Sequence, residues 1–342
     1  MTNYAHINQY GSITDALEAL DGSGVLEFGA GLYDLGEGLC IDGQIELVGA
    51  GRNATTLSYG GAGAAIQINS GRGIVTKRWG LRDLALIGAG GVGLRLGQGA
   101  TSPQSANTGV VERLHISGFA VGAHCQFSQI NTFRDVTFES NATGLLMVPD
   151  LPGINGNTST TLLGCLFLRN SGVGAELRDA AHIAFVDCLF EGNGLEGAKL
   201  NKLDNSTGRR SVRFNRCYFE GNNNGRSETG HAQLWIDSKV MAGWQDVSVS
   251  WCFFSGAGAN NAHIRIGKAL AEVVYANVAD GQPLGITGNN ATEQTVVIES
   301  HAQPSWVGDG LLPVLWRQAG GDGQYRMMRL VNGALESTVA IY

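Results

Sequence analysis

The sequence predicts an all-β protein wound as a right-handed parallel β-helix, a solenoid in which short strands stack rung upon rung. Two observations predict this fold: a motif that recurs with constant internal spacing, and a composition rich in turn-forming residues. Glycine accounts for 51 of the 342 residues, charged residues for only 15 % and hydrophobic residues for 43 %. This balance is too apolar for a disordered chain and is typical of a β protein with many turns.

The recurring motif consists of a cysteine, a phenylalanine two residues later and an asparagine five residues later. Complete copies occupy residues 165–170, 188–193 and 217–222, and partial copies begin at Val136 and Cys252. Successive copies lie 29, 23, 29 and 35 residues apart. Because the motif is constant while its period varies, the extra residues must lie in turns, as they do in a β-helix. Helical and leucine-rich repeats are excluded, since neither periodic pattern is present.

Two inward-facing rows follow from the register of these copies. The first is a row of buried, reduced thiols beside a row of phenylalanines on the same interior face, consisting of Cys165, Cys188, Cys217, Cys252, Phe138, Phe167, Phe190, Phe219 and Phe254. The second is a row of turn asparagines whose amides can hydrogen-bond from rung to rung, consisting of Asn141, Asn170, Asn193 and Asn222. Cys40 and Cys125 are expected to be buried in the same way. With no acid or histidine beside the cysteines, no metal and no cofactor are predicted.

The two ends of the chain depart from the repeat. Residues 1–22 include the pattern of a short capped helix at 12–20, which we expect to close one end of the solenoid. The solenoid itself is predicted for residues 23–300. Residues 301–342 include apolar runs on both sides of Asn332 and Gly333, which predict a β-hairpin that closes the other end or joins subunits.

After the helix pattern comes the segment 24–33, Gly-Val-Leu-Glu-Phe-Gly-Ala-Gly-Leu-Tyr. This arrangement resembles the opening of the pectate-lyase-like β-helix superfamily, in which a helix caps the solenoid before a strand of similar pattern. Ala30 stands where that superfamily usually has proline. The resemblance covers roughly residues 10–300 and implies the fold rather than the function, because the superfamily includes lyases, hydrolases, epimerases and viral spikes. The motifs of pectinase hydrolases and alginate epimerases are absent.

One outward pair suggests catalysis. Glu191 and Glu220 occupy the same position one rung apart, so their backbones should lie about 5 Å apart. Two carboxylates at about that separation suit a retaining glycosidase. The alternative is a solvated surface pair whose charge nearby arginines partly neutralise.

The second strand of each rung suggests a binding surface. Its outward rows are expected to be Met147, Glu176, Lys199, Gln233 and His263, and Pro149, Arg178, Asn201, Trp235 and Arg265. Trp235 beside Arg178 and Arg265, with His263 nearby, would stack on a sugar and pair with its carboxylate. The alternative is a Trp235 buried by a loop.

A third outward row, Thr137, Leu166, Leu189, Tyr218 and Phe253, is more apolar than a solvated sheet face should be. We therefore expect it to be covered, either by a C-terminal arm or by the neighbouring subunits of a homotrimer whose interface includes Leu166, Leu189, Tyr218 and Phe253.

Charge and termini narrow the function. A net charge of -7 without a basic stripe in the sequence argues against a nucleic-acid partner. No apolar run is long enough to cross a membrane, and the first residues lack the pattern of a secretory signal.

The leading hypothesis is a homotrimeric virion spike, resembling bacteriophage tailspikes. It would attach to other virion proteins and bind a bacterial surface polysaccharide, with cleavage left open. We expect it in the virion, with an extracellular location as the alternative. The rival hypotheses are a stand-alone polysaccharide lyase or glycoside hydrolase, and a non-catalytic structural or adhesive solenoid.

Overall fold

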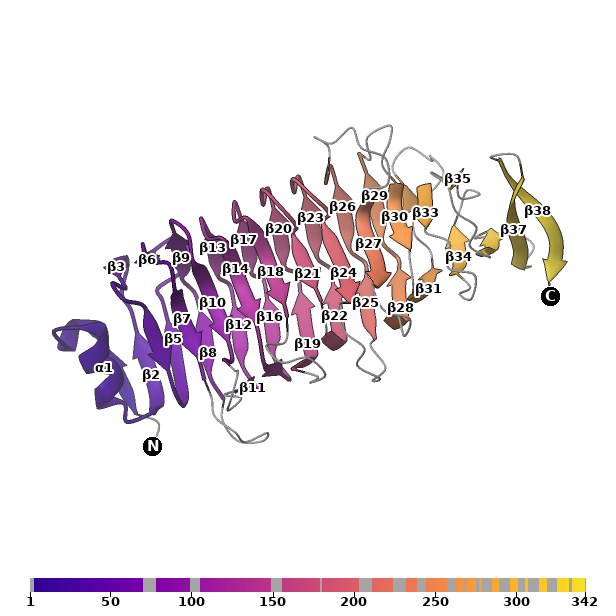
Figure 1. The fold of residues 1–342 in the computed structure, drawn as a ribbon. Coiled ribbons are helices and arrows are strands. Elements are labelled where there is room, and N and C mark those ends of the chain that lie inside the picture. Colours follow the sequence, from indigo (N-terminus) through magenta and orange to yellow (C-terminus); the bar gives the residue numbers. More distant parts are fainter. Residues whose placement is uncertain are drawn as a thin grey trace.

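A computed structural model describes residues 3–69, 78–98, 105–148, 156–178, 180–202, 211–223, 232–238, 244–256, 262–266, 269–274, 277–278, 285–288, 296–300, 305–306, 314–318, 325–331 and 334–341. Over this part the chain is an elongated parallel β-helix with three sheets along its length (Figure 1). A typical rung gives one strand to each sheet in turn, as β16 (Thr132–Arg134), β17 (Thr137–Glu139) and β18 (Thr143–Met147) do. The predicted fold is confirmed.

The strands divide among the sheets as follows. The first sheet contains β1 (Tyr4–His6), β2 (Ser23–Glu27), β5 (Gln44–Val48), β8 (Gly80–Arg82), β11 (Ala106–Asn107), β12 (Val110–Glu112), β15 (Ser128–Gln129), β16, β19 (Asn157–Leu163), β22 (Ala180–Val186), β25 (Val212–Asn215), β28 (Trp244–Ser250), β31 (Ala269–Val274), β34 (Val296–Ser300), β36 (Val314–Gln318), β37 (Tyr325–Val331) and β38 (Ala334–Ile341). The second contains β3 (Gly31–Asp34), β6 (Thr55–Tyr59), β9 (Ala85–Gly88), β13 (His115–Ser117), β17, β20 (Leu166–Leu168), β23 (Leu189–Glu191), β26 (Tyr218–Glu220), β29 (Phe253–Ser255) and β32 (Asn277–Val278). The third contains β4 (Leu39–Ile41), β7 (Ala64–Ile68), β10 (Val92–Leu96), β14 (Val121–Cys125), β18, β21 (Ala175–Leu177), β24 (Ala198–Lys202), β27 (Ala232–Ser238), β30 (Ala262–Ile266), β33 (Gly285–Gly288) and β35 (Ser305–Trp306).

The core is built from stacked identical residues. The rings of Phe138, Phe167, Phe190, Phe219 and Phe254 form one continuous stack with centroid separations of 4.6 to 5.0 Å. Parallel strands lie about 4.8 Å apart, so a residue that repeats in register places each ring directly against the next. The phenylalanine row is therefore confirmed.

The cysteine row is confirmed as well, but of the two further cysteines expected to be buried, only one is. Cys165, Cys188, Cys217 and Cys252 are free thiols exposed by no more than 1 %, and each donates a hydrogen bond to a backbone carbonyl. Cys125 is also buried. The expectation for Cys40 is wrong: it is the central residue of the short strand β4, whose alternation places it outward and exposed.

The asparagine row forms a buried hydrogen-bonded ladder. The side-chain oxygen of Asn193 accepts from the backbone N–H of Asn170 at 3.1 Å and from its side-chain amide at 2.9 Å. The Asn193 amide in turn donates to the Phe167 carbonyl at 2.9 Å and to Asn222 at 2.7 Å. The same pattern links Asn141 to Asn170. Each amide thus satisfies backbone groups at the turn between the second and third sheets.

The two ends of the solenoid differ in structure. The predicted helix α1 (Ile13–Ala19) begins at Ser12, whose hydroxyl accepts from the Asp15 N–H at 3.1 Å, and it lies at one end of the solenoid (Figure 1). Before it, β1 already pairs in parallel with β2 and a short 3-10 helix, η1 (Ile7–Gln9), follows β1. At the other end, β37 pairs antiparallel with β36 and β38. The residues between β37 and β38 lie outside the described part of the chain. In the described part, no helix is long and apolar enough to span a membrane.

Candidate functional site

Glu191 and Glu220 are neighbours across β23 and β26 of the second sheet, as their spacing predicts. Both side chains face outward and are half-buried. Among the described residues, neither carboxylate forms an ion pair with an arginine or lysine, in contrast to Glu139 of the same sheet, which pairs with Arg169. The expectation that arginines neutralise this pair is therefore not met in the described part of the chain. Within the described residues, the two carboxylates lie side by side without a basic partner.

An aromatic pair lies directly beside these carboxylates. Tyr218 and Phe253 project outward from adjacent strands of the second sheet, with ring centroids 5.3 Å apart and ring planes 9° from parallel. Partial burial raises the pKa of the Tyr218 phenol, and the charges of Glu220 and Glu191 contribute in the same direction. The predicted apolar row thus does face outward, and Leu166, Leu189, Tyr218 and Phe253 are half-buried in a single chain.

The outward row of the third sheet differs from the expected one. Cross-strand partners define it as Gln67, Arg95, His124, Leu146, Glu176, Lys199, Trp235 and Arg265. Met147, expected outward, is fully buried, because Leu145 and Met147 alternate inward in β18. Gln233 is also buried, and its amide donates to the Ser255 carbonyl. Pro149 lies outside the described residues.

Trp235 is the centre of this row. The Lys199 ammonium lies 4.4 Å from the ring centroid of Trp235, and the Arg265 guanidinium lies 4.2 Å from it. Cations at this distance from an indole face are attracted by the ring quadrupole. The predicted association of Trp235 with Arg265 is therefore present, and Lys199 completes a cation–aromatic–cation arrangement that the sequence reasoning missed.

Arg178 and His263 are not beside Trp235 in the expected way. Arg178 follows β21, two strands away from β27, and its guanidinium donates to the two carboxylate oxygens of Glu176 at 2.9 and 3.2 Å. His263 packs edge-on against the core ring of Phe254 with centroids 6.0 Å apart. Burial lowers the pKa of the His263 imidazole to about 4, so it is neutral at pH 7.

The other end of the row contains two residues that the sequence reasoning did not select. Arg95 of β10 and His124 of β14 are cross-strand partners, and both are half-buried. Burial, together with the nearby charges of Arg95 and Arg178, lowers the pKa of His124 to about 4. Arg95 and His124 are 29 residues apart and belong to weak copies of the repeat. The one signal in the sequence that could have linked them is that each lies near the end of its third-sheet strand, just before a turn.

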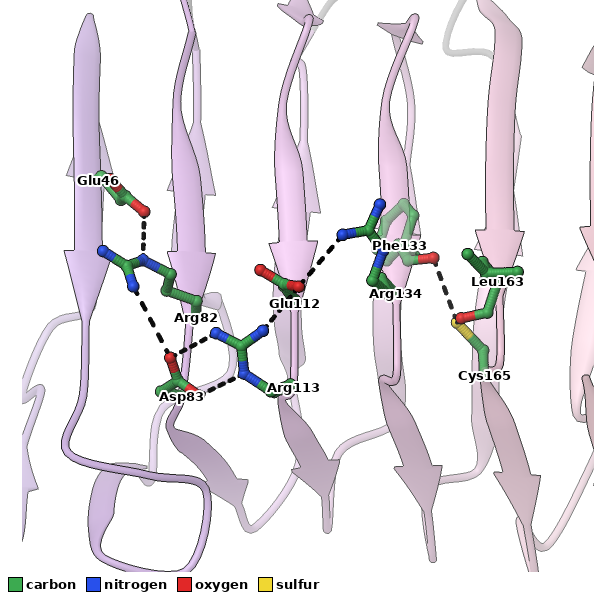
Figure 2. Close-up of polar contacts among 9 residues, drawn as sticks. All are labelled: Glu46, Arg82, Asp83, Glu112, Arg113, Phe133, Arg134, Leu163 and Cys165. Atoms are coloured by element: carbon green, nitrogen blue, oxygen red, sulfur yellow. Dashed lines mark hydrogen bonds and ion pairs between the residues drawn. The ribbon is translucent and has the colours of Figure 1, made fainter.

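A charged network lies on the first sheet and on its turn into the second sheet (Figure 2). Glutamate and arginine alternate along the sheet at Glu46, Arg82, Glu112 and Arg134. At the turn, Arg113 donates to both oxygens of Asp83 at 2.6 and 2.7 Å, which lowers the pKa of the Asp83 carboxyl. Both turn residues adopt a left-handed backbone, with φ of 52° and 59°, so their side chains project from equivalent places one rung apart. Because each cation faces an acid, the network neutralises itself.

Two hollows lie on the described part of the protein, and neither contains the residues predicted to form a site. A hollow of about 390 Å³ borders the Asp83–Arg113 pair, and one of about 670 Å³ lies near α1 and β3. Neither includes Glu191, Glu220 or Trp235. Within the described ranges, no group of three or more histidine, cysteine or acidic side chains is arranged to hold a metal ion.

Comparison with known families agrees with this architecture. Residues 64–240, more than half of the chain, match the family described as the right handed beta helix region. The chain belongs to the right-handed β-helix family. A search of curated proteins gave no significant match to this β-helix protein.

Solved structures share the fold at low sequence identity. The A-module of the mannuronan C-5 epimerase AlgE4 from Azotobacter vinelandii aligns with a TM-score of 0.65 and 14 % identity, over 92 % of this chain and 91 % of that one. An alginate lyase from Paenibacillus aligns with a TM-score of 0.63 and 14 % identity, over 90 % and 98 %. The gp42 tailspike of the Acinetobacter phage AS12 aligns with a TM-score of 0.62 and 12 % identity, over 99 % and 67 %. This β-helix thus shares its fold with polysaccharide-processing enzymes and a phage tailspike.

Proposed function

We propose that this β-helix protein is a virion spike that binds an acidic polysaccharide of a bacterial surface through the outward face of its third sheet. The observation that carries the proposal is Trp235 between Lys199 and Arg265. The indole holds the two cations against its faces, and the cations can pair with carboxylates carried by neighbouring sugars. Together with Arg95 they give the outward row of the third sheet three cations, although the whole chain has a net charge of -7; the charge of Arg178 is balanced by Glu176.

The fold likenesses support this class of function. The tailspike of the Acinetobacter phage has this fold over nearly the whole of the present chain. Two further neighbours bear the names of alginate and mannuronan enzymes. Fold likeness alone leaves function open, so the assignment depends on the chemistry of the third sheet.

The binding test compares two tryptophans. Trp235→Ala should weaken binding of acidic capsular or exopolysaccharides by about tenfold or more, because the ring that holds Lys199 and Arg265 in place is lost. Trp251→Ala is the matched control, since Trp251 is 59 % exposed at the turn between the first and second sheets. Binding should also weaken with added salt, which screens exposed charges. Equal affinity of wild type and Trp235→Ala, measured by calorimetry, would refute the third-sheet assignment.

The virion part of the proposal concerns assembly. The outward row Leu166, Leu189, Tyr218 and Phe253 is half-buried in one chain, so completing the burial of each side chain would gain only part of the about 1.5–3 kcal/mol that full burial contributes. We therefore propose a homotrimer that covers this row, attached to other virion proteins. A monomer mass in light scattering, or absence of the protein from purified particles, would contradict it.

A second candidate function, depolymerisation, rests on Glu191 and Glu220. They lie on the second sheet, whereas Trp235 lies on the third, so cleavage would take place on a different face from the proposed binding row. If they are the acid and the nucleophile, Glu191→Gln and Glu220→Gln should each abolish sugar release while glycan binding persists. If neither substitution changes release, the pair is not catalytic. If wild type releases no sugar, the protein binds without cleaving.

A further inference from the structure

Arg95 and His124 form a second polar pair on the third sheet, distant from Trp235. Their Cα atoms are cross-strand partners in β10 and β14, and both side chains project from the outward face. Four strand steps, from β14 through β18, β21 and β24 to β27, separate His124 from Trp235. At about 4.8 Å per step, this distance is roughly 19 Å along the solenoid.

The hydrogen-bonding capacity of this pair is incomplete. The Nε of Arg95 and the Nε2 of His124 are both inaccessible to solvent, and neither has a hydrogen-bond partner among the described residues. No acid in the described part of the chain forms an ion pair with Arg95, unlike Arg178, which Glu176 holds through two hydrogen bonds. A desolvated donor without a partner costs about 1–3 kcal/mol, and more when it is charged. A ligand that draws either side chain outward would recover this cost.

The charge of the surroundings defines the ligand. Arg95 contributes a positive charge that no acid among the described residues pairs with, while the charge of Arg178 is already balanced by Glu176. The imidazole of His124 is neutral at pH 7, because its pKa is lowered to about 4, and it can present an N–H to an acceptor. A guanidinium beside an imidazole N–H suits a single carboxylate, which accepts from both groups.

We propose that Arg95 and His124 form an anion subsite that binds the carboxylate of an acidic sugar. This inference rests on the proposed polysaccharide function and deepens it. It assigns the substrate class, a uronate-type polymer, and a binding register in which one acidic sugar lies at β10–β14 while another lies at the Lys199–Trp235–Arg265 cluster. The subsite selects against neutral polymers, since a hydroxyl or an ester in place of the carboxylate would leave the Arg95 charge unpaired.

The test uses sodium galacturonate as the probe and observes the imidazole resonances of His124 by NMR. Galacturonate should shift these resonances saturably in the wild-type protein, and its methyl ester should not. Arg95→Gln should weaken this binding by about tenfold or more, because a charge-assisted hydrogen bond is lost. Arg213→Gln is the matched control: it removes the same charge from an exposed arginine of the first sheet.

The outcomes separate this inference from the proposed function. Trp235→Ala should keep the galacturonate shift at His124 while it loses polysaccharide affinity. If Trp235→Ala keeps both the galacturonate shift and full polysaccharide affinity, the subsite is supported and the role of the Trp235 surface is refuted. The subsite is overturned if galacturonate leaves the His124 resonances unchanged, or if Arg95→Gln and wild type respond equally. Equal affinities for acetate and galacturonate would overturn the assignment to a sugar.

Discussion

His124→Gln provides a quantitative test of the buried imidazole on the third sheet. The pKa of His124 is lowered from 6.5 to about 4 by burial and by the charges of Arg95 and Arg178. At pH 8 the imidazole is neutral in both the folded and the unfolded chain, so it has almost no effect on stability there. As the pH falls from 6.5 towards 4, the unfolded chain takes up a proton that the folded chain does not, and stability is lost.

The magnitude follows from the two pKa values. Their difference corresponds to about 3.4 kcal/mol when fully developed, and about 2 kcal/mol of that is developed at pH 5. Glutamine does not titrate, so His124→Gln should gain about 2 kcal/mol relative to wild type between pH 8 and pH 5. The charged side chains that act on His124 are Arg95 and Arg178, and Arg178 is bound to Glu176.

Urea unfolding followed by circular dichroism at pH 5, 6, 7 and 8 measures this difference. The pH dependence of the wild type alone cannot isolate His124, because burial also lowers the pKa of His263 to about 4. For the same reason, His263→Gln should show a gain of the same sign. A free-energy difference between wild type and His124→Gln that is constant from pH 8 to pH 5 would refute the burial argument.

Three further predictions concern the solenoid itself. Asn193→Ala should destabilise the fold by about 3–6 kcal/mol, since it leaves several buried groups of the ladder without partners, whereas the exposed Asn53→Ala should have little effect in the same unfolding experiment. Phe190→Ala should cost about 3–5 kcal/mol, because this ring stacks on both sides at 4.7 and 4.6 Å; a smaller loss than for an exposed leucine would contradict the stacked core. Arg216→Gln should leave the thermal midpoint unchanged, since its ion pair with Asp187 is exposed; a large shift would show that the turn pairs stabilise the rungs.

The sequence by itself was sufficient to predict which residues form the inward rows. Cysteine, phenylalanine and asparagine recur at fixed offsets within each copy, and a residue with constant offset must stack on its own copies once the strands are parallel and in register. For this reason the stacks of Phe190 and Asn193 could be predicted without coordinates. The adjacency of Glu191 and Glu220 followed from the same offsets, because each lies one residue after its phenylalanine.

The outward face of the third sheet was decided only by the tertiary structure. In the run Leu145–Leu146–Met147–Val148 every residue is apolar, so alternation could not show which two face inward, and a slip of one residue reverses the faces. In β27 the sequence favoured pairing Ala232 with Ala198, whereas Leu234 is the true partner. A slip of two residues leaves every side chain on its own face, so hydrophobic alternation cannot detect it.

That two-residue slip changes the chemistry of the surface. It places Trp235 beside Lys199 rather than Asn201, and it separates Trp235 from Arg178. The pairing of Arg95 with His124 has the same origin, since a register across 29 residues depends on how much chain the intervening turn consumes. The sequence determined which residues repeat; the turns, through the lengths they absorb, determined which outward side chains meet.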